Sequence, residues 1–509
     1  MKAGEKLEEI QRETYQEEGK EFPSSIYSDL VLSPGFEHAV KFNLYDLRQI
    51  NIAHLVMLTE ENLIDQPTAK SIMQALLSID YAKYGDMKYT GEYEDLYFTL
   101  EAEIIRIVGP RGGLLHLARS RNDIDTTLQR MLVKKNILKV MQGQERFLKT
   151  ILAFAEAYKD VPTIEHTHTQ QAQPSVIGHY FLAAFSLVYR DYIRLLHAYE
   201  TTDCCPMGAA AITTSGFAIN RERVAELLGF AQVQENSYDS IGGADFILEY
   251  ANALQLAAID LGKMTFDLLS WATQEYGILK VDDAFIQVSS IMPQKRNPVA
   301  LEHSRAFLSS VVGECGTMTT MLHNTPYGDI NDQEDDMVPF ITDASDRLEK
   351  VYHLLSSVIA TMKVNTKILT ERLENSFCVI TELADTIVRN EDISFREAHS
   401  VASKLVSYCT TNDIKLSGVS FELIKGIYEE TLKIPMKGSK ESVLTALTAK
   451  NFIEKRTVEG GIALKPMLDM IGHSTKKLDD MNEWMAKRKV ILQAAADTCE
   501  EEARKIAAI

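Results

Sequence analysis

The sequence predicts an all-α protein, and three observations support this fold class. The 509 residues include only 13 prolines, and long stretches of the chain lack glycine. Where periodicity can be tested, apolar residues recur every three or four positions, which is the spacing of a helix with one buried face. Alternating apolar and polar runs bounded by turn residues are scarce, so a sheet-based domain is not expected.

The middle third of the chain predicts long helices. From Phe246 to Leu268, apolar or small residues recur at helical spacing almost without interruption. A helix of roughly 26 residues here would be about 40 Å long. Residues 175–199 predict another helix, which is apolar on almost every side between Phe181 and Val188 and must therefore be surrounded by other helices. We expect a central long-helix bundle at 118–370, flanked by smaller helical domains at 1–117 and 371–509.

Composition excludes several classes of function. Fifty-three Lys and Arg against 72 Asp and Glu give a formal net charge of −19. This is the wrong sign for a protein that follows a phosphate backbone, so we expect no nucleic-acid partner. No Gly-x-Gly-x-x-Gly or Walker-type loop occurs, which argues against a dinucleotide or a nucleoside triphosphate.

The location of the protein is predicted from its first residues and its cysteines. The charged N-terminus lacks the apolar core of a secretory signal, and no apolar run approaches the ~20 residues that span a bilayer. Six cysteines are scattered without a Cys-x-x-Cys pair or a histidine at metal-ligand spacing. We interpret them as reduced thiols of a cytoplasmic protein, and expect neither a membrane segment nor a metal site.

The segment Ser289–Pro298 is the most informative loop of the chain. It reads Ser-Ser-Ile-Met-Pro-Gln-Lys-Arg-Asn-Pro. Asn297 is a good N-cap and Pro298 suits the first helical position, so the loop should lead into a helix. Two serines, a lysine and an amide on the approach to a helix N-terminus predict an anion-binding site.

Together with three further segments, this loop resembles the fumarase/aspartase superfamily. The loop is similar to the pattern Gly-Ser-Ser-x-x-Pro-x-Lys-x-Asn-Pro, with Val288 in place of the usual glycine. Residues 116–123, His-Leu-Ala-Arg-Ser-Arg-Asn-Asp, are similar to a segment of the argininosuccinate lyase branch. Residues 167–174 match Thr-His-x-Gln-x-Ala-Gln-Pro, and 206–208 with 236–240 resemble segments around the family's central helices. The segments occur in family order, and the resemblance covers nearly the whole chain.

The resemblance implies an assembly and a reaction. Members of the superfamily are all-helical homotetramers that associate through the central bundle, and segments of three subunits form each active site. Helices that are apolar on nearly every side are consistent with such partners. The implied reaction eliminates an amine or guanidine from an N-substituted L-aspartate and produces fumarate. No cofactor is implied, because side chains and backbone can supply the acid, the base and the anion stabilisation.

The resemblance also assigns catalytic roles. Ser289 matches the base that removes the proton next to a carboxylate, and Lys295 and Asn297 match the groups that stabilise the resulting dianion. His168 matches the histidine near the leaving group, and Glu302 matches its acidic partner. A carboxylate beside an imidazole raises its pKa, which suits proton delivery.

Other matched residues are implied to bind substrate. The arginine among them is suited to this task, because its planar fork can engage a carboxylate through two hydrogen bonds. The residues that match the family's carboxylate-binding positions are Ser120, Arg121, Asn122 and Thr167. Tyr327 and Gln333 match two further binding residues, in the family segment Tyr-Asn-Lys-Asp-Leu-Gln-Glu-Asp-Lys.

The chain departs from argininosuccinate lyases at positions expected to face the amine half of the substrate. Tyr97 stands where the family has histidine, and Ala244 where it has arginine. Residues 327–336 lack both family lysines and are acidic, with Asp336 in place of the second lysine. This acidic run could be a solvated helix start, a set of metal ligands or a surface for a cationic group. If it faces the site, it favours an N-substituted aspartate with a cationic amine half.

Three functions remain open on the sequence alone. The first is cleavage of argininosuccinate to arginine and fumarate, as in arginine biosynthesis. The second is the same chemistry on an aminopolycarboxylate such as ethylenediaminedisuccinate. The third is a catalytically silent, crystallin-like structural relative, although the presence of the five residues matched to proton transfer and anion stabilisation argues against it.

Overall fold

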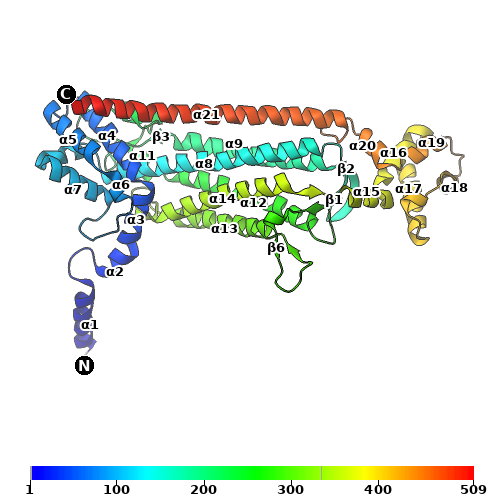
Figure 1. Cartoon of the computed structure of the whole chain (residues 1–509), viewed down its shortest axis with the longest axis horizontal. Helices are drawn as coiled ribbons and strands as arrows, with labels where there is room; N and C mark the ends of the chain where they lie inside the picture. The colour runs from blue at the N-terminus through cyan, green and yellow to red at the C-terminus, as the bar shows by residue number, and fades with distance from the viewer. Residues whose placement is uncertain (1–2, 334, 509) are drawn as a thin grey trace.

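The computed structural model describes residues 3–333 and 335–508, which form an elongated, predominantly helical molecule (Figure 1). The first part of the chain forms α1 (Ala3–Glu18), α2 (Ser25–Tyr27), a π-helical turn η1 (Ser28–Leu32), α3 (Ser33–Phe42), α4 (Leu44–Glu60), α5 (Gln66–Ser78), α6 (Tyr81–Tyr84), α7 (Leu96–Val108) and a 3₁₀ segment η2 (Pro110–His116). The all-α fold class is confirmed.

Five long helices form the central bundle: α8 (Arg121–Ala157), α9 (Ile177–Thr202), α12 (Asp245–Trp271), α13 (Val299–Leu322) and α14 (Val338–Thr361). Two short helices, α10 (Arg221–Leu227) and α11 (Ser237–Gly242), lie at one end of it. The far end carries α15 (Thr366–Asn375), α16 (Ile380–Glu391), α17 (Phe395–Thr411), α18 (Phe421–Leu432), α19 (Lys440–Thr445) and α20 (Ala449–Glu454) (Figure 1). Short 3₁₀ turns fill loops: η3 (Asp283–Phe285), η4 (Asn331–Gln333), η5 (Asp335–Met337), η6 (Phe377–Val379) and η7 (Leu416–Gly418).

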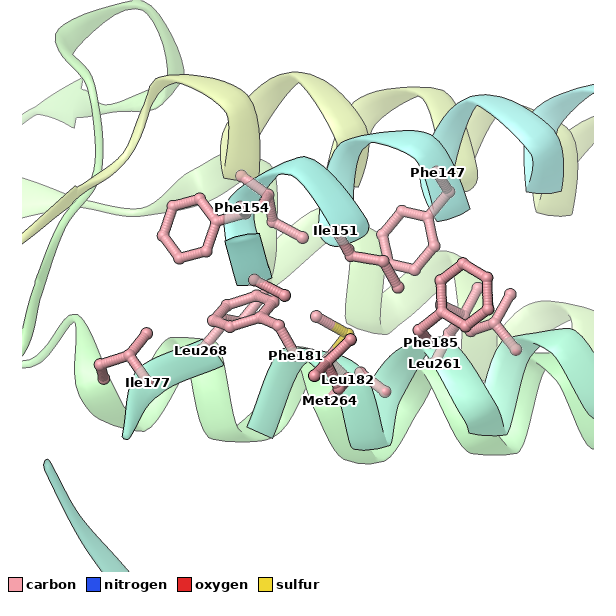
Figure 2. Close-up of a cluster of buried hydrophobic side chains, with 14 of the residues drawn as sticks. Phe147, Ile151, Phe154, Ile177, Phe181, Leu182, Phe185, Leu261, Met264 and Leu268 are labelled. Carbon is pink, nitrogen blue, oxygen red and sulfur yellow. The ribbon is translucent and has the colours of Figure 1, made fainter. Parts of the chain in front are cut away.

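The bundle core is built from side chains at helical spacing (Figure 2). Phe147, Ile151 and Phe154 occupy one face of α8, and Phe154 meets Phe181 of α9 with ring centroids 4.5 Å apart. Leu261, Met264 and Leu268 of α12 complete the cluster, and all of these side chains are buried. Each fully buried side chain of this size contributes roughly 1.5–3 kcal/mol, which explains why α9 needs neighbours on several sides.

The predicted long helices are confirmed, with small shifts at their ends. The helix expected around 246–268 is α12, with 27 residues, and α9 begins at Ile177 because Ser175 belongs to a strand. The predicted start of α13 is wrong by one residue. Asn297 pairs in a short strand and Pro298 takes the N-cap position, so the helix begins at Val299.

One feature of the chain was not predicted: its last helix runs back along the whole bundle. The helix α21 (Leu464–Ala508) has 45 residues and packs on α4, α5, α8 and α9 (Figure 1). Arg488 of α21 reaches Asp203 at 3.7 Å, beside the buried ion pair that Asp203 makes with Lys134 of α8. The C-terminal region therefore contacts the N-terminal region through α21. The domain boundaries at 117 and 370 stay predictions.

Four small two-stranded sheets hold loops between the helices. Two are antiparallel hairpins that carry motif residues: β1 (Pro162–Thr167) with β2 (Gln170–Val176), and β6 (Gln287–Val288) with β7 (Arg296–Asn297). The others are β3 (Cys204–Cys205), parallel to β4 (Gln232–Val233), and β5 (Leu279–Lys280), antiparallel to β8 (Lys363–Val364).

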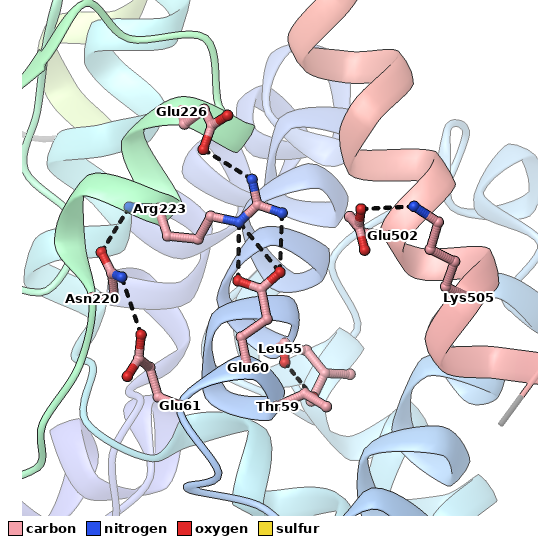
Figure 3. Close-up of polar contacts among 9 residues, drawn as sticks. All are labelled: Leu55, Thr59, Glu60, Glu61, Asn220, Arg223, Glu226, Glu502 and Lys505. Carbon is pink, nitrogen blue, oxygen red and sulfur yellow. Dashed lines mark hydrogen bonds and ion pairs between the residues drawn. The ribbon is translucent and has the colours of Figure 1, made fainter.

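Polar contacts attach the first helices to the bundle (Figure 3). Arg223 of α10 donates to both carboxylate oxygens of Glu60, at 2.9 and 3.0 Å, and Asn220 donates to Glu61 at 3.0 Å. A two-point guanidinium–carboxylate contact fixes orientation as well as distance. It therefore aligns α4 with α10.

The described residues show three further properties. No helix among them combines the length and apolarity needed to cross a membrane. Nor does any group of three or more of their His, Cys, Asp and Glu side chains have an arrangement that could hold a metal ion. All six cysteines are buried and free.

Candidate active site

The start of α8 is organised around a buried carboxylate, Asp123. One of its oxygens accepts from the backbone N–H of Ser120 at 2.9 Å, and the other accepts from Gly208 and Ala210, both at 2.9 Å. Burial raises the pKa of Asp123 to about 6. Gly208 has φ +85°, a backbone conformation that favours glycine. Asp123 thus joins two segments that the sequence matched separately.

Arg121 and Asn122 follow in the first turn of α8, and carboxylates hold both. Arg121 donates to Glu94 and Asp95, each at 3.0 Å. The Asn122 amide donates to Asp329 at 2.7 Å. Residues from the predicted first domain and from the acidic run therefore meet at the predicted carboxylate-binding positions.

Tyr327 and Gln333 belong to the same group of residues. The buried Gln333 amide donates to the carbonyls of Ile241 and Gly328, both at 2.9 Å. The exposed Tyr327 hydroxyl donates to Asp239 at 2.7 Å, which raises the pKa of Tyr327 to about 12. In this chain Gln333 orders the loop that carries Tyr327, a role that its sequence match did not indicate.

Tyr97 and Ala244, two positions at which the chain differs from argininosuccinate lyases, lie at the end of the bundle where α8 begins. Tyr97 is buried, donates to Glu101 at 2.9 Å and makes a short hydrogen bond with His116. Its ring lies 5.6 Å from the guanidinium of the buried Arg119. Ala244 occupies the N-cap position of α12. The network around Tyr97 gives His116 a partner, which the sequence could not identify.

Thr167 and His168 lie at the tip of the β1–β2 hairpin. The loop consists of His168 and Thr169, with φ +51° and +63°, which is the conformation of a tight hairpin turn. Both predicted residues are exposed. Thr169 and Gln170 line a cavity of about 500 Å³ that also includes Glu275, just after α12.

The Ser289 loop is closed by the pairing of β6 with β7. The Ser289 hydroxyl oxygen accepts from the backbone N–H of Met292 at 3.1 Å and of Ile291 at 3.4 Å. Two donated N–H groups favour a negative oxygen, which is the form that a serine base requires. Arg296 anchors the loop through contacts with Asp283 and with the carbonyl of Val281.

A cavity of about 580 Å³ adjoins this loop. Lys295, Asn297 and Glu302 line it together with Leu269 and Ser270 of α12 and residues 272–275, which follow that helix. Lys295 and Glu302 are exposed. Three of the predicted residues are therefore brought together here, and Glu275 belongs to this cavity as well as to the one at the hairpin.

A single chain does not unite all predicted residues. Gly242, which packs against Gly328, marks the Asn122 and Tyr327 end of α12, and the Ser289 cavity lies at the other end. The 27 residues of α12 separate the two by about 40 Å. The 37 residues of α8 likewise separate Ser120 from the β1–β2 hairpin by about 55 Å.

Several residues of this site were missed by the sequence predictions: Asp123, Glu94, Asp95 and Asp329. Asp123 stands in the matched segment itself, and an acidic residue three positions after a serine is a signal for a capped helix start. The partners of Arg121 and Asn122 carry no comparable local signal, because they are about 25 and 200 residues away in sequence.

Comparison with known proteins shows the family of this chain. A family model described as "Lyase" matches residues 42–313, and one described as "Argininosuccinate lyase C-terminal" matches 377–454. Argininosuccinate lyase 2 of Agrobacterium fabrum is 36% identical over 91% of this chain and 92% of its own length. The chain belongs to the argininosuccinate lyase family. It is a carbon–nitrogen lyase, with a family relative in Methanosphaera stadtmanae that is 31% identical over 83% of this chain and 90% of the relative.

Solved structures of the superfamily share the fold. EDDS lyase in complex with formate superimposes with a TM-score of 0.84 at 25% identity, over 92% of this chain and 95% of that one. Class II fumarase from Schistosoma mansoni superimposes with a TM-score of 0.65 at 14% identity, over 80% and 91% of the two chains. The likeness to fumarase supports the fold alone.

Proposed function

We propose that this lyase cleaves argininosuccinate into arginine and fumarate by general acid–base elimination. The observation that carries the proposal is the Ser289 hydroxyl, which accepts two backbone N–H groups on a loop bordering a cavity with Lys295 and Asn297. That arrangement suits removal of a proton next to a carboxylate. The argininosuccinate lyase names of relatives with 30–36% identity support the substrate.

In the proposed mechanism, Ser289 takes the proton from the succinyl carbon. Lys295 and Asn297 stabilise the dianionic intermediate that forms. His168, oriented by Glu302, protonates the nitrogen as the carbon–nitrogen bond breaks. The residues proposed to hold the substrate are Ser120, Arg121, Asn122, Thr167, Tyr327 and Gln333.

We propose that the active enzyme is a cytoplasmic homotetramer in which different subunits complete each site. The separation of the predicted residues along α8 and α12 supports this, since one chain cannot place them around one substrate. Both α12 and α13 also expose large apolar side chains, with Phe266 59% and Phe307 44% exposed. Apolar side chains on neighbouring bundle helices are suited to packing against other subunits. The buried free cysteines support a reducing compartment.

The Ser289→Ala variant tests the mechanism. Loss of the base should lower kcat for argininosuccinate on the order of 10²–10⁴-fold, with folding and assembly retained. Fumarate release is followed by ultraviolet absorbance. The control is Ser400→Ala, at an exposed position on α17 outside the assigned residues, which should retain activity. Unchanged turnover by Ser289→Ala would remove this residue from the mechanism.

A second candidate substrate is an aminopolycarboxylate of the ethylenediaminedisuccinate type. The superposition with EDDS lyase favours it. Parallel assays of fumarate release from argininosuccinate and ethylenediaminedisuccinate decide between them. The compound with the higher kcat/KM is the better candidate for the substrate of this enzyme.

A further inference from the structure

An acidic cavity of about 440 Å³ lies beside the predicted carboxylate-binding residues. Arg121 and Asn122 line it on the side of α8, and the segment 27–43 covers another side. Its carboxylates are Glu94, Asp95, Asp125, Asp329 and Asp336. Arg121 is the single Lys or Arg among the described residues that line it, and Glu94 and Asp95 already engage that side chain. The cavity therefore carries a surplus of negative charge.

Two of these carboxylates come from the run that replaces the family's basic segment. Asp329 accepts from the neutral amide of Asn122 at 2.7 Å, and so adjoins a residue proposed to bind substrate. Asp336 is exposed and has no cationic partner among the residues that the structure describes. Both side chains can therefore accept from a ligand that enters the cavity.

A buried amide of the same cavity lacks a hydrogen-bond donor within the described part of the chain. Asn43 lines the cavity and is only 8% exposed, yet its side-chain oxygen has no hydrogen-bond partner within the described part of the chain. A buried acceptor without a donor is costly, so such atoms are normally satisfied in the functional state. An ammonium or guanidinium group offers N–H donors of the kind that the carboxylates and the amide of this cavity can accept.

We propose that this cavity binds the amine half of the substrate through a cationic group at its distal end, with Asp329 and Asp336 as specificity-determining residues. This inference rests on the proposed lyase function and names the substrate class. The preferred leaving group is a guanidine or amine that ends in an ammonium group and carries no carboxylate. A carboxylate at that end would meet like charges and, among the described lining residues, no Lys or Arg other than Arg121, which Glu94 and Asp95 already engage.

Three substrates that differ only at the distal end test the proposal. They are argininosuccinate and the corresponding compounds in which the guanidine nitrogen of agmatine, which keeps the ammonium alone, or of 5-guanidinovalerate, which keeps the carboxylate alone, carries the same 1,2-dicarboxyethyl group. We expect kcat/KM from fumarate release to be at least tenfold higher for the agmatine derivative than for the guanidinovalerate derivative, mainly through KM. Argininosuccinate should lie between them.

The outcomes separate this inference from the proposed function. Equal or faster turnover of the guanidinovalerate derivative overturns the cationic preference and leaves the lyase function intact. No fumarate from any of the three substrates contradicts the proposed guanidine elimination itself, and the inference falls with it.

Substitutions in the cavity test which residues cause the preference for a cationic group. Asp336→Lys should reverse the order of the agmatine and guanidinovalerate derivatives, and Asp329→Asn should lower kcat/KM for the agmatine derivative about tenfold. The control is Asp332→Asn, an exposed member of the same acidic run that does not line the cavity, which should leave the order unchanged. An unchanged order in Asp336→Lys, with the fold retained, would remove Asp336 from substrate recognition.

Discussion

Asp123 shows how one side chain can order several parts of a site. Its carboxylate is buried and accepts three backbone N–H groups, from Ser120, Gly208 and Ala210. It therefore holds the first turn of α8 against the loop at 206–210. Since Arg121 and Asn122 lie in that turn, their positions depend on this buried contact.

Replacing Asp123 by asparagine should destabilise the protein. Asparagine keeps one oxygen but places an NH₂ group against backbone donors, which leaves at least one buried N–H without an acceptor. We expect unfolding in urea to lose about 1–3 kcal/mol. The control is Asp86→Asn, at an exposed position, which should change stability little. Equal stability of Asp123→Asn and the wild type would show that the N–H groups find other partners.

Among the helices of the bundle, α9 buries an acidic residue at its centre. Asp191 is 0% exposed and accepts from Arg194 at 2.6 Å, while its other oxygen has no partner within the described residues. Burial, followed by the charge of Asp260 on α12, raises the pKa of Asp191 to about 7, and Arg194 and Arg190 oppose the shift. Tyr352 of α14, which accepts from Gln144 of α8 at 3.0 Å, also faces this region.

This carboxyl should make the stability of the bundle depend on pH. Its pKa in the folded protein is above the unfolded value, so its neutral form stabilises folding below about pH 4, and that contribution is lost as pH rises through about 7. Asp191→Asn should therefore raise the urea midpoint more at about pH 8 than at about pH 5. A midpoint change that is the same at both values would show that Asp191 does not titrate in this range.

The proposed assembly rests on the placement of the predicted site residues at opposite ends of the bundle. Asn122 lies at the start of α8, whereas Ser289 lies on the loop at the far end of α12. No local movement of a loop spans the roughly 40 Å between them. In the proposed function, a site that combines these residues would need other copies of the chain.

Mixing two inactive variants tests this arrangement. If Ser289 and Asn122 of one site belong to different subunits, tetramers assembled at random from Ser289→Ala and Asn122→Ala chains should regain about a quarter of wild-type activity. The mixture is made by refolding the two chains together, and each variant refolded alone is the control. Tetramers that regain no activity would place both residues of a site in one chain.

The central helices and the segments that resemble the family's motifs could be predicted from the sequence, because both depend on local patterns. The three- and four-residue spacing from Phe246 to Leu268 reports one helix face, and α12 was found there. The segments at 116–123, 167–174 and 289–298 are contiguous, so a resemblance could identify them without any knowledge of how they meet. The predicted start of α13 was wrong by only one residue. Asn297 pairs with β6 and therefore does not cap the helix.

Only the tertiary structure decided which distant groups touch. The return of α21 along the bundle, the ion pairs of Arg121 with Glu94 and Asp95, and the use of Gln333 to order a loop all join residues far apart in sequence. The same holds for the acidic cavity, which collects carboxylates from three separate segments. Such contacts depend on which helix faces meet once apolar surface is buried, and no local pattern records that choice. The sequence thus determined the helices and the class of chemistry, whereas packing decided the neighbours of each reactive side chain.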